Sequence, residues 1–305
     1  MEVPAPPFWL SAPAYWVPEH FPPSAWVTHA PFASWLVDVV RPSRIVELGT
    51  HYGYSCFAFA EAVKRLGLDT TISALDSWEG DDHAGHYGDE VHEYVASVAA
   101  ADYPDSVRLV RGWFSQSRPL FADASIDVLH IDGRHAYEDV LTDYSQWRGT
   151  VADGGVILFH DIAERENGFG VWRLWEDIAE PGRSFTFTHG HGLGVLAVGR
   201  IRHPRLQELF DADEVTATRV RADFERLGES IAHRVRLEAL EEELAKVWAE
   251  VRSRALHEDQ LEAELRSQLN EMIEQDRYIN ALKASRSWRM TAPLRALGKL
   301  RPRRG

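Results

Sequence analysis

The chain has 305 residues, 45% hydrophobic and 26% charged, which is enough for one large or two smaller folded domains. Its formal net charge of −14 argues against nucleic-acid binding, because neutralising phosphates requires a basic surface. The single cysteine, Cys56, excludes a disulfide framework within the chain and fits a reducing compartment.

Residues 1–25 form an arm that is rich in proline and aromatic residues. The stretch MEVPAPPFWLSAPAYW lacks the charged start and continuous apolar core of a signal peptide. No run in the chain approaches the roughly 18 apolar residues that a membrane span needs. We therefore expect a soluble, cytoplasmic protein whose arm either packs over the folded domain or serves as a flap over an active site.

Residues 26–202 alternate between strand-like and helix-like patterns. The apolar runs are RIVELG, TISALD, VRLVRG, IDVLHID and GGVILFHD. Helical patterns lie between them at YSCFAFAEAVKRLG, EVHEYVASVAAA and AYEDVLTDYSQWRGTVA. This alternation predicts an α/β domain with a mainly parallel sheet covered on both faces. SFTFTHG and GLGVLAVG follow without a long helix between them, which favours a closing antiparallel hairpin.

Such sheets bind ligands at the carboxyl ends of their strands, so we examined the residues after each apolar run. The first run ends in VELGTHYGYS, where Glu47 closes the strand and Gly49 and Gly53 permit a tight turn. Ser55 lies near the start of the next helix, where backbone N–H groups favour a carboxylate or phosphate. The GxGxxG pattern is absent, because His51 stands where a second glycine would fall.

The second and third runs end in ALDSWEGDDH and RGWFSQS. Asp76 is placed to accept hydrogen bonds from a ribose, and Trp78 to lie against an adenine ring. Ser115 is placed to bond an adenine edge. The structural alternatives are a helix cap for Asp76 or Ser115 and core packing for Trp78.

The fourth and fifth runs end in HIDGRH and FHD, which bring Asp132 and Asp161 to neighbouring strand ends beside His135 and His160. Divalent cations favour such carboxylate oxygens. A histidine, with an intrinsic pKa near ~6.5, suits a general base. The alternative is that Asp132 caps the following helix while the histidines pack.

Residues 203–284 carry a long helical pattern without an internal proline. Steps of three and four from Leu237 to Leu282 give fourteen seam positions, ten of them apolar. This spacing predicts a coiled coil, and hence a homo-oligomer.

Residues 285–305 form a basic tail, and eight basic but no acidic residues lie between Lys283 and the C-terminus. Trp288 and Met290 interleave with arginines, which suits an amphipathic segment, although Pro293 limits a continuous helix. The tail predicts contact with the inner face of the plasma membrane or with an acidic partner. The alternative is an unstructured terminus that only increases solubility.

Taken in order, these motifs resemble class I S-adenosylmethionine-dependent methyltransferases. More narrowly, they resemble the bacterial family related to macrolide-sugar O-methyltransferases and cephalosporin-hydroxylase-type proteins. The resemblance covers about residues 26–200 and rests on VELGTHYGYS, LDSWEGD, HIDGRHAYEDVLTDYSQW, GGVILFHDI and FGVWRLWEDI followed by HGHGLGVLAVG. It implies a Rossmann-like, seven-stranded sheet with helices on both faces and the last strand antiparallel.

The resemblance also implies a site. It assigns S-adenosylmethionine binding to residues that follow the first three strands: Glu47, Gly49, Thr50, Tyr52, Gly53, Ser55, Asp76, Trp78 and Ser115. It assigns Mg²⁺ to Asp132 and Asp161, with His135 as the catalytic base. His160 stands where some relatives carry an acidic residue, and we expect it to be the third ligand.

We therefore predict a metal-assisted O-methyltransferase that acts on a sugar hydroxyl of a cell-surface glycan or glycosylated metabolite. The tail also resembles tails on bacterial proteins of polysaccharide assembly. One alternative is a catechol-like or other small hydroxylated acceptor. Another is a non-catalytic scaffold of a polysaccharide assembly complex that acts through its coiled coil.

Overall fold

The computed structural model describes residues 6–81 and 85–298, with the backbone alone for residues 81 and 296–298. The start of the predicted arm and the end of the predicted basic tail lie outside these ranges. The chain divides into two units, residues 1–236 and 237–305, which are described separately. Within the described residues, no helix combines the length and apolarity required to cross a bilayer.

The first unit is built on a seven-stranded sheet in the order β5-β2-β1-β6-β7-β9-β8. Its strands are β1 Arg44–Leu48, β2 Thr71–Asp76, β5 Val107–Arg111, β6 Ile126–Ile131, β7 Val151–His160, β8 Ser184–Phe187 and β9 Leu193–Ala197. In this sheet β9 runs opposite to the other six strands, which are parallel to one another. The predicted parallel sheet with a closing hairpin is therefore confirmed. A separate two-stranded ribbon joins β3 Gly80–Asp81 to β4 Gly85–His86.

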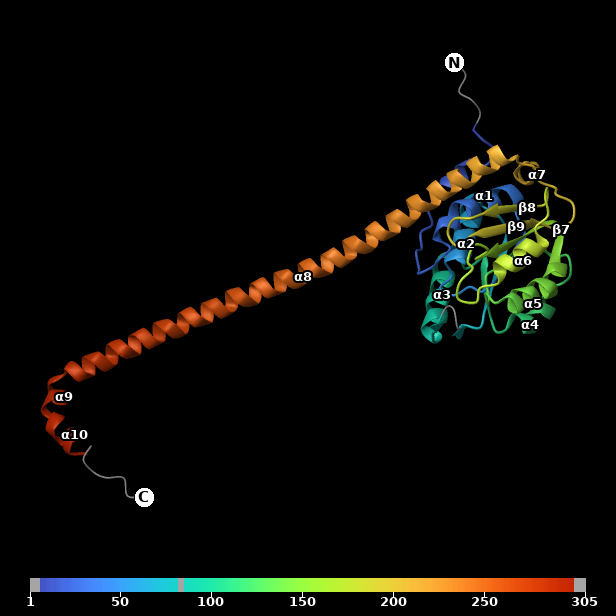
Figure 1. Ribbon diagram of the computed structural model, residues 1–305. Helices are drawn as coiled ribbons and strands as arrows, with labels where there is room; N and C mark the ends of the chain where they lie inside the picture. Colours follow the sequence, from blue (N-terminus) through green and yellow to red (C-terminus); the bar gives the residue numbers. More distant parts are fainter. Residues whose placement is uncertain (1–5, 82–84, 299–305) are drawn as a thin grey trace, which may run out of the picture. The chain divides into compact units, whose positions relative to one another are not determined.

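Helices cover both faces of the sheet, because successive strand residues point to opposite sides. Ile45 of β1 packs into one core and Val46 into the other. The first core is covered by α1 Ala30–Val40, α2 Tyr54–Leu66, α3 Asp89–Asp102 and α7 Pro204–Phe210. The second is covered mainly by α5 Tyr137–Trp147 and α6 Val171–Ile178, with α4 Phe114–Ser117 beside α5 (Figure 1). Short 3₁₀ turns occupy Ala12–Tyr15, Val27–His29, Arg118–Leu120 and Arg148–Thr150.

One predicted helix is shorter than expected. The pattern over residues 136–152 predicts a helix throughout, but α5 ends at Trp147 and a 3₁₀ turn follows. Val151 instead opens β7 and pairs with Ile126 of β6. The β-branched side chain of Val151 is buried in that sheet, so tertiary pairing outweighs the local helical pattern.

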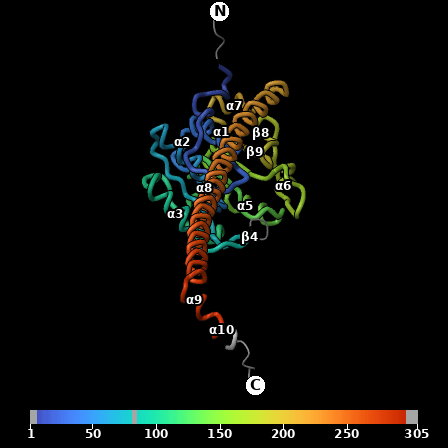
Figure 2. The backbone as a smooth tube through the Cα atoms, turned by 90° about the vertical axis from the view of Figure 1, so that its left-hand side faces the viewer, coloured from blue at the N-terminus to red at the C-terminus, as the bar shows by residue number. Residues whose placement is uncertain are grey.

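The N-terminal arm packs against the first unit. The indole N–H of Trp9 donates to the Asp223 carboxylate at 3.0 Å, and that of Trp35 donates to the Phe8 carbonyl at 3.2 Å. Figure 2 shows this blue segment beside the first part of α8. These contacts favour the packed arrangement over a free flap, although the end of the arm also reaches the cavity described below.

The first unit extends beyond the expected boundary at residue 202. The long helix α8 spans Glu214–Ala284, and its first turns bury Ala217, Val220, Phe224 and Ile231. At Gly228 an added Cβ would overlap the backbone carbonyl of Thr28, so the helix packs closely there. The residues between 203 and 236 therefore complete the core of the first unit instead of starting a separate one.

The second unit is helical. The rest of α8 is followed by α9 Arg286–Met290 and α10 Ala292–Gly298. This confirms the long helix predicted from the heptad spacing.

Candidate functional site

The loop between β1 and α2 passes closely over the end of β6. Gly49 adopts φ +93°, and an added Cβ would overlap the carbonyl oxygen of Asp132. Gly53 adopts φ +84° directly before α2 begins at Tyr54. Both positions need glycine, because L side chains rarely adopt these conformations. The loop thus presents backbone N–H groups and a helix start next to the end of β6.

Asp76 fixes the shape of that loop. Its Oδ2 accepts from the backbone N–H groups of Thr50 at 2.9 Å and His51 at 2.8 Å. Its Oδ1 accepts from the N–H of Trp78 at 2.7 Å. The carboxylate is buried yet lines the cavity, and Oδ1 retains lone pairs for a ligand hydroxyl. It is bonded across two loops and does not cap a helix.

Glu47 contacts residues of the site but lies outside the cavity lining. Its side chain is fully buried, and its Oε1 accepts from Ser55 Oγ at 2.6 Å and from His130 Nδ1 at 3.0 Å. Glu47 does not line the cavity, whereas Gly49, Thr50, Tyr52, Gly53 and Ser55 do. Its contribution to ligand binding is therefore indirect, through the position of Ser55.

The two residues predicted to contact adenine differ in their placement. Trp78 is buried, donates its indole N–H to the His51 carbonyl at 3.0 Å, and lies outside the cavity lining. Ser115 lines the cavity in the first turn of α4, whose N-cap is Trp113. The packing alternative thus describes Trp78, and the capping alternative does not describe Ser115.

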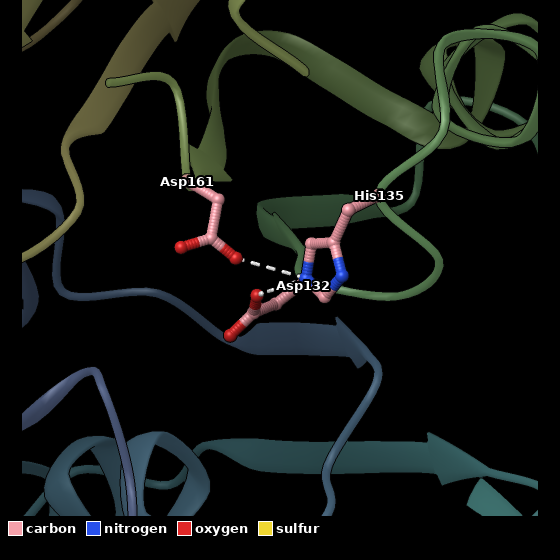
Figure 3. A group of neighbouring side chains, drawn as sticks. All are labelled: Asp132, His135 and Asp161. Carbon is pink, nitrogen blue, oxygen red and sulfur yellow. Dashed lines mark ion pairs between the residues drawn. The ribbon is translucent and has the colours of Figure 1, made fainter. Parts of the chain in front are cut away.

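The carboxyl ends of β6 and β7 bring Asp132, His135 and Asp161 together, as Figure 3 shows. Their candidate ligand atoms lie within 4.8 Å of one another. His135 Nε2 is 2.9 Å from Asp161 Oδ2 and 3.7 Å from Asp132 Oδ1. Asp132 does not cap α5, since the N-cap is Ala136 and receives no side-chain bond.

His160 approaches the same carboxylates from the buried side. Its Nδ1 is 3.2 Å from Asp132 Oδ1 and 3.3 Å from Asp161 Oδ1. Its Nε2 is 3.1 Å from the carbonyl oxygen of Gly190. A carbonyl only accepts, so Nε2 carries the proton and Nδ1 faces the two carboxylates. Metal-binding histidines are typically oriented by such a carbonyl.

Gly190 and His29 form a support that the sequence did not identify. His29 Nε2 donates to the same Gly190 carbonyl at 2.9 Å. Burial, followed by the charges of His160 and His189, holds the pKa of His29 well below its usual range, so this imidazole is neutral. Two N–H donors therefore fix one carbonyl, and that carbonyl fixes His160.

The charges at this cluster are strongly coupled. Burial alone would raise the pKa values of the aspartates, but the neighbouring histidines outweigh it and lower the pKa of Asp161 to about 2. Burial lowers and the aspartates raise the pKa of the histidines, to about 9 for His135 and about 10 for His160. Two ionised carboxylates thus hold two cations beside them. For His135 to accept a proton, another positive charge must compensate these carboxylates.

A cavity of about 390 Å³ joins the β1–α2 loop to this cluster. Its wall includes residues that the sequence analysis missed: Pro23, Trp26, Tyr87, Trp113, Asp139 and Asp143. Trp113 lies directly after the third apolar run, so its position at a strand end was a signal that could have identified it. Trp26 directly precedes the 3₁₀ turn Val27–His29, and Asp143 lies on a face of α5, and no local pattern marks either residue.

Similarity to known proteins covers the part of the chain that holds this site. Residues 46–162 match a family model described as a methyltransferase domain. That segment runs from β1 to just beyond Asp161, so the chain contains a methyltransferase domain over these residues. The uncharacterized protein y4gI of Sinorhizobium fredii (strain NBRC 101917 / NGR234) is 46% identical over 183 residues, which cover 59% of this chain. The match covers only 20% of that relative's length.

Solved structures with similarity to this chain include two O-methyltransferases. One, from Bacillus cereus in complex with SAH, has 18% identity, a TM-score of 0.44, and coverage of 60% of this chain and 84% of that chain. The other is TomG from Streptomyces achromogenes, involved in tomaymycin synthesis and in complex with SAM. It has 20% identity, a TM-score of 0.42, and coverage of 58% of this chain and 88% of that chain.

Asp143 yields a prediction about stability. Burial, and then the charge of Asp139, raises the pKa of the Asp143 carboxyl to about 7. The folded state therefore holds this proton more tightly than the unfolded state, and its stabilising effect is lost as the pH rises from about 4 through 7. We expect Asp143→Asn to be more stable than the wild type by about 2 kcal/mol at pH 8, and equal to it near pH 4.

Urea titrations of both proteins across this pH range measure the difference. The control is Asp105→Asn, which removes an exposed carboxylate outside the cavity lining. A flat difference for Asp143→Asn would contradict the prediction.

Proposed function

We propose that the chain is an S-adenosylmethionine-dependent O-methyltransferase that is assisted by a divalent cation. The observation that carries the proposal is the single cavity that joins a glycine-rich strand-to-helix loop to the cluster of Asp132, His135, His160 and Asp161. The methyltransferase-domain match over residues 46–162 supports it. The narrower relation to sugar O-methyltransferases remains a prediction.

The donor set fits a divalent cation. Asp132 and Asp161 supply carboxylate oxygens, and His160 supplies an Nδ1 whose orientation is fixed by Gly190. Carboxylates suit Mg²⁺, while the imidazole also suits Mn²⁺ or other transition metals. His135 is the more exposed histidine of the two, with a side chain 14% accessible against 2% for His160. We therefore assign His160 to the metal and His135 to proton transfer.

The loop residues fit the methyl donor. The glycines let the loop approach the end of β6 and the start of α2 closely, and Asp76 Oδ1 is available to a ribose hydroxyl. In the sheet, β5 lies on one side of β1, whereas β6 and β7, which precede the acidic cluster, lie on the other side. Ser115 follows β5 and lines the cavity, so it is placed where an adenine would follow the ribose. Trp78 is not included, because it is buried outside the cavity.

The mechanism then assigns one task to each group of this chain. S-adenosylmethionine would supply an electrophilic methyl group, and a cation held by Asp132, His160 and Asp161 would lower the pKa of the acceptor hydroxyl. His135 Nε2 takes the hydroxyl proton, and the N–H that forms there then donates to Asp161 Oδ2, which lies 2.9 Å away. Enclosing both reactants in one cavity makes the transfer effectively intramolecular, which lowers the barrier by up to roughly 7–11 kcal/mol.

The first test uses the site residues. We expect Asp132→Ala and His135→Ala to lower methyl transfer by at least ~10²-fold, since each removes a group that acts on the acceptor hydroxyl. Their affinity for S-adenosylmethionine should change by no more than a few-fold. Titration calorimetry with and without Mg²⁺ measures binding, and a methyl-transfer assay measures turnover. The control is His203→Ala, because His203 lies outside the cavity lining.

Failure of the wild-type protein to bind S-adenosylmethionine would instead favour the scaffold alternative. Full activity of either site variant would remove its assigned role.

The acceptor is tested separately. We propose a sugar hydroxyl, and the aromatic side chains Trp26, Tyr87 and Trp113 around the cavity support a ring-shaped acceptor. A panel of glycans and catechols, with product analysis by mass spectrometry, should give methylated glycan as the main product. Methylation of catechols alone would replace the sugar by the alternative acceptor class.

The basic tail is proposed to bind the inner face of the plasma membrane or a glycan-assembly complex. Deleting residues 284–305 should move the protein into the soluble fraction without lowering its catalytic activity, because the cavity lies wholly within the first unit. Fractionation of cells that express the full and the shortened chain measures this. Identical fractionation would favour a tail that only increases solubility.

A further inference from the structure

The second unit carries an apolar stripe along one continuous helix. Its ten seam residues are between 43% and 67% exposed: Leu237, Leu240, Leu244, Val247, Val251, Leu261, Leu265, Met272, Ile279 and Leu282. They repeat at the heptad positions a and d, starting with a at Leu237. Such a contiguous apolar stripe indicates association with another helix.

Two charged residues interrupt the stripe at its middle. Arg254 occupies a d position and Glu258 the following a position. Arg254 contacts Glu250 at 2.6 Å, on a neighbouring turn of the same helix. In the part of the chain that the structure describes, Glu258 forms no ion pair, and the residue one turn further on is Glu262, which pairs with Arg266. Arg254, one turn before Glu258, pairs with Glu250 instead, so in the described structure Glu258 has no ion pair on its own helix.

We propose that two copies of the chain pair through residues 237–275 as an antiparallel coiled coil in which Arg254 faces the partner's Glu258. A two-fold axis makes each such contact occur twice. The same register places Val251 against the partner's Leu261, and Val247 against the partner's Leu265. It also places Leu240 against the partner's Met272. The charged interruptions thus become two ion pairs between apolar layers.

A parallel pair does not solve the same problem. In a parallel two-stranded coil each seam residue meets its own copy, so Arg254 would meet arginine and Glu258 would meet glutamate. Two successive layers would then hold like charges away from water, where such charges are costly unless they are paired. The antiparallel arrangement pairs both.

The register follows from the same two residues. Sliding one helix by a heptad in either direction brings Arg254 and Glu258 against valine or leucine, which leaves neither charge with a partner across the interface. Gln268 and Gln275 then lie opposite Leu244 and Leu237, toward the ends of the overlap, where a neutral amide reaches water more easily. In the proposed register, glutamates beside the seam face one another only at the exposed edge of the interface. Water and salt screen their repulsion there.

A charge exchange tests the pairing in the full-length protein. We expect Arg254→Glu alone to raise the dimer dissociation constant at least tenfold, because it sets glutamate against the partner's Glu258. Combining it with Glu258→Arg should restore dissociation to within about threefold of the wild type. Sedimentation equilibrium measures both, with circular dichroism confirming equal helix content. The matched control is Arg252→Glu, an exposed charge reversal outside the seam that should leave the constant unchanged.

Cysteine cross-linking gives an independent measurement of orientation. Cys56 is fully buried, so introduced cysteines report without interference. The variant with both Val251→Cys and Leu261→Cys should form disulfide-linked dimers on mild oxidation, whereas neither single variant should. Cross-linking of a single variant would show parallel pairing and overturn the proposal. Absence of cross-linking in all three, or a double charge variant that stays dissociated, would also overturn it.

Discussion

The arrangement of the site depends on the acidic pair of Asp132 and Asp161, whose two negative charges lie close together. Parallel pairing of β6 with β7 sets Ile131 opposite Phe159, so the residues that follow each strand emerge side by side. Two carboxylates this close and this buried repel each other unless positive charge lies between them. His135 and His160 supply that charge here, one from each side. The two carboxylates are thus stable together only with positively charged groups beside them.

This demand extends outward through the fold. His160 can face the carboxylates only because its other nitrogen donates to Gly190, whose φ of +54° and contact with Thr28 leave no space for a side chain. Gly190 is fixed in turn by His29, at the start of α1. The N-terminal segment, the β8–β9 hairpin and the ends of β6 and β7 therefore depend on one another. A structural change in any of these segments would therefore alter the position of His160 beside the acidic pair.

The sequence predicted the parts of this arrangement that follow from local pattern. Strand-end reasoning found Asp132, Asp161, His135 and His160, because parallel strands deliver their last residues to one edge of a sheet. It misplaced Trp78, since burial depends on the direction in which a loop turns, and φ at Trp78 is +52°. It also missed Asp143 and His29, because only tertiary packing brings a helix face and an N-terminal turn to that edge. Similarly, the first unit extends to Arg236 because α8 packs onto it, which the uninterrupted helical pattern could not reveal.

Charged residues have different roles in the cavity of the first unit and in the proposed helix pairing of the second. In the cavity, burying like charges creates a site that remains unsatisfied until a cation or proton compensates it. Along the second part of α8, the charges at Arg254 and Glu258 would weaken the proposed, mainly apolar seam. Replacing both by leucine would strengthen association but permit parallel and shifted pairings of similar energy. The cost in affinity is therefore offset by a single orientation and register. In the proposed site and the proposed dimer the same rule applies: a buried charge needs an opposite charge, which selects a cation in one unit and a partner geometry in the other.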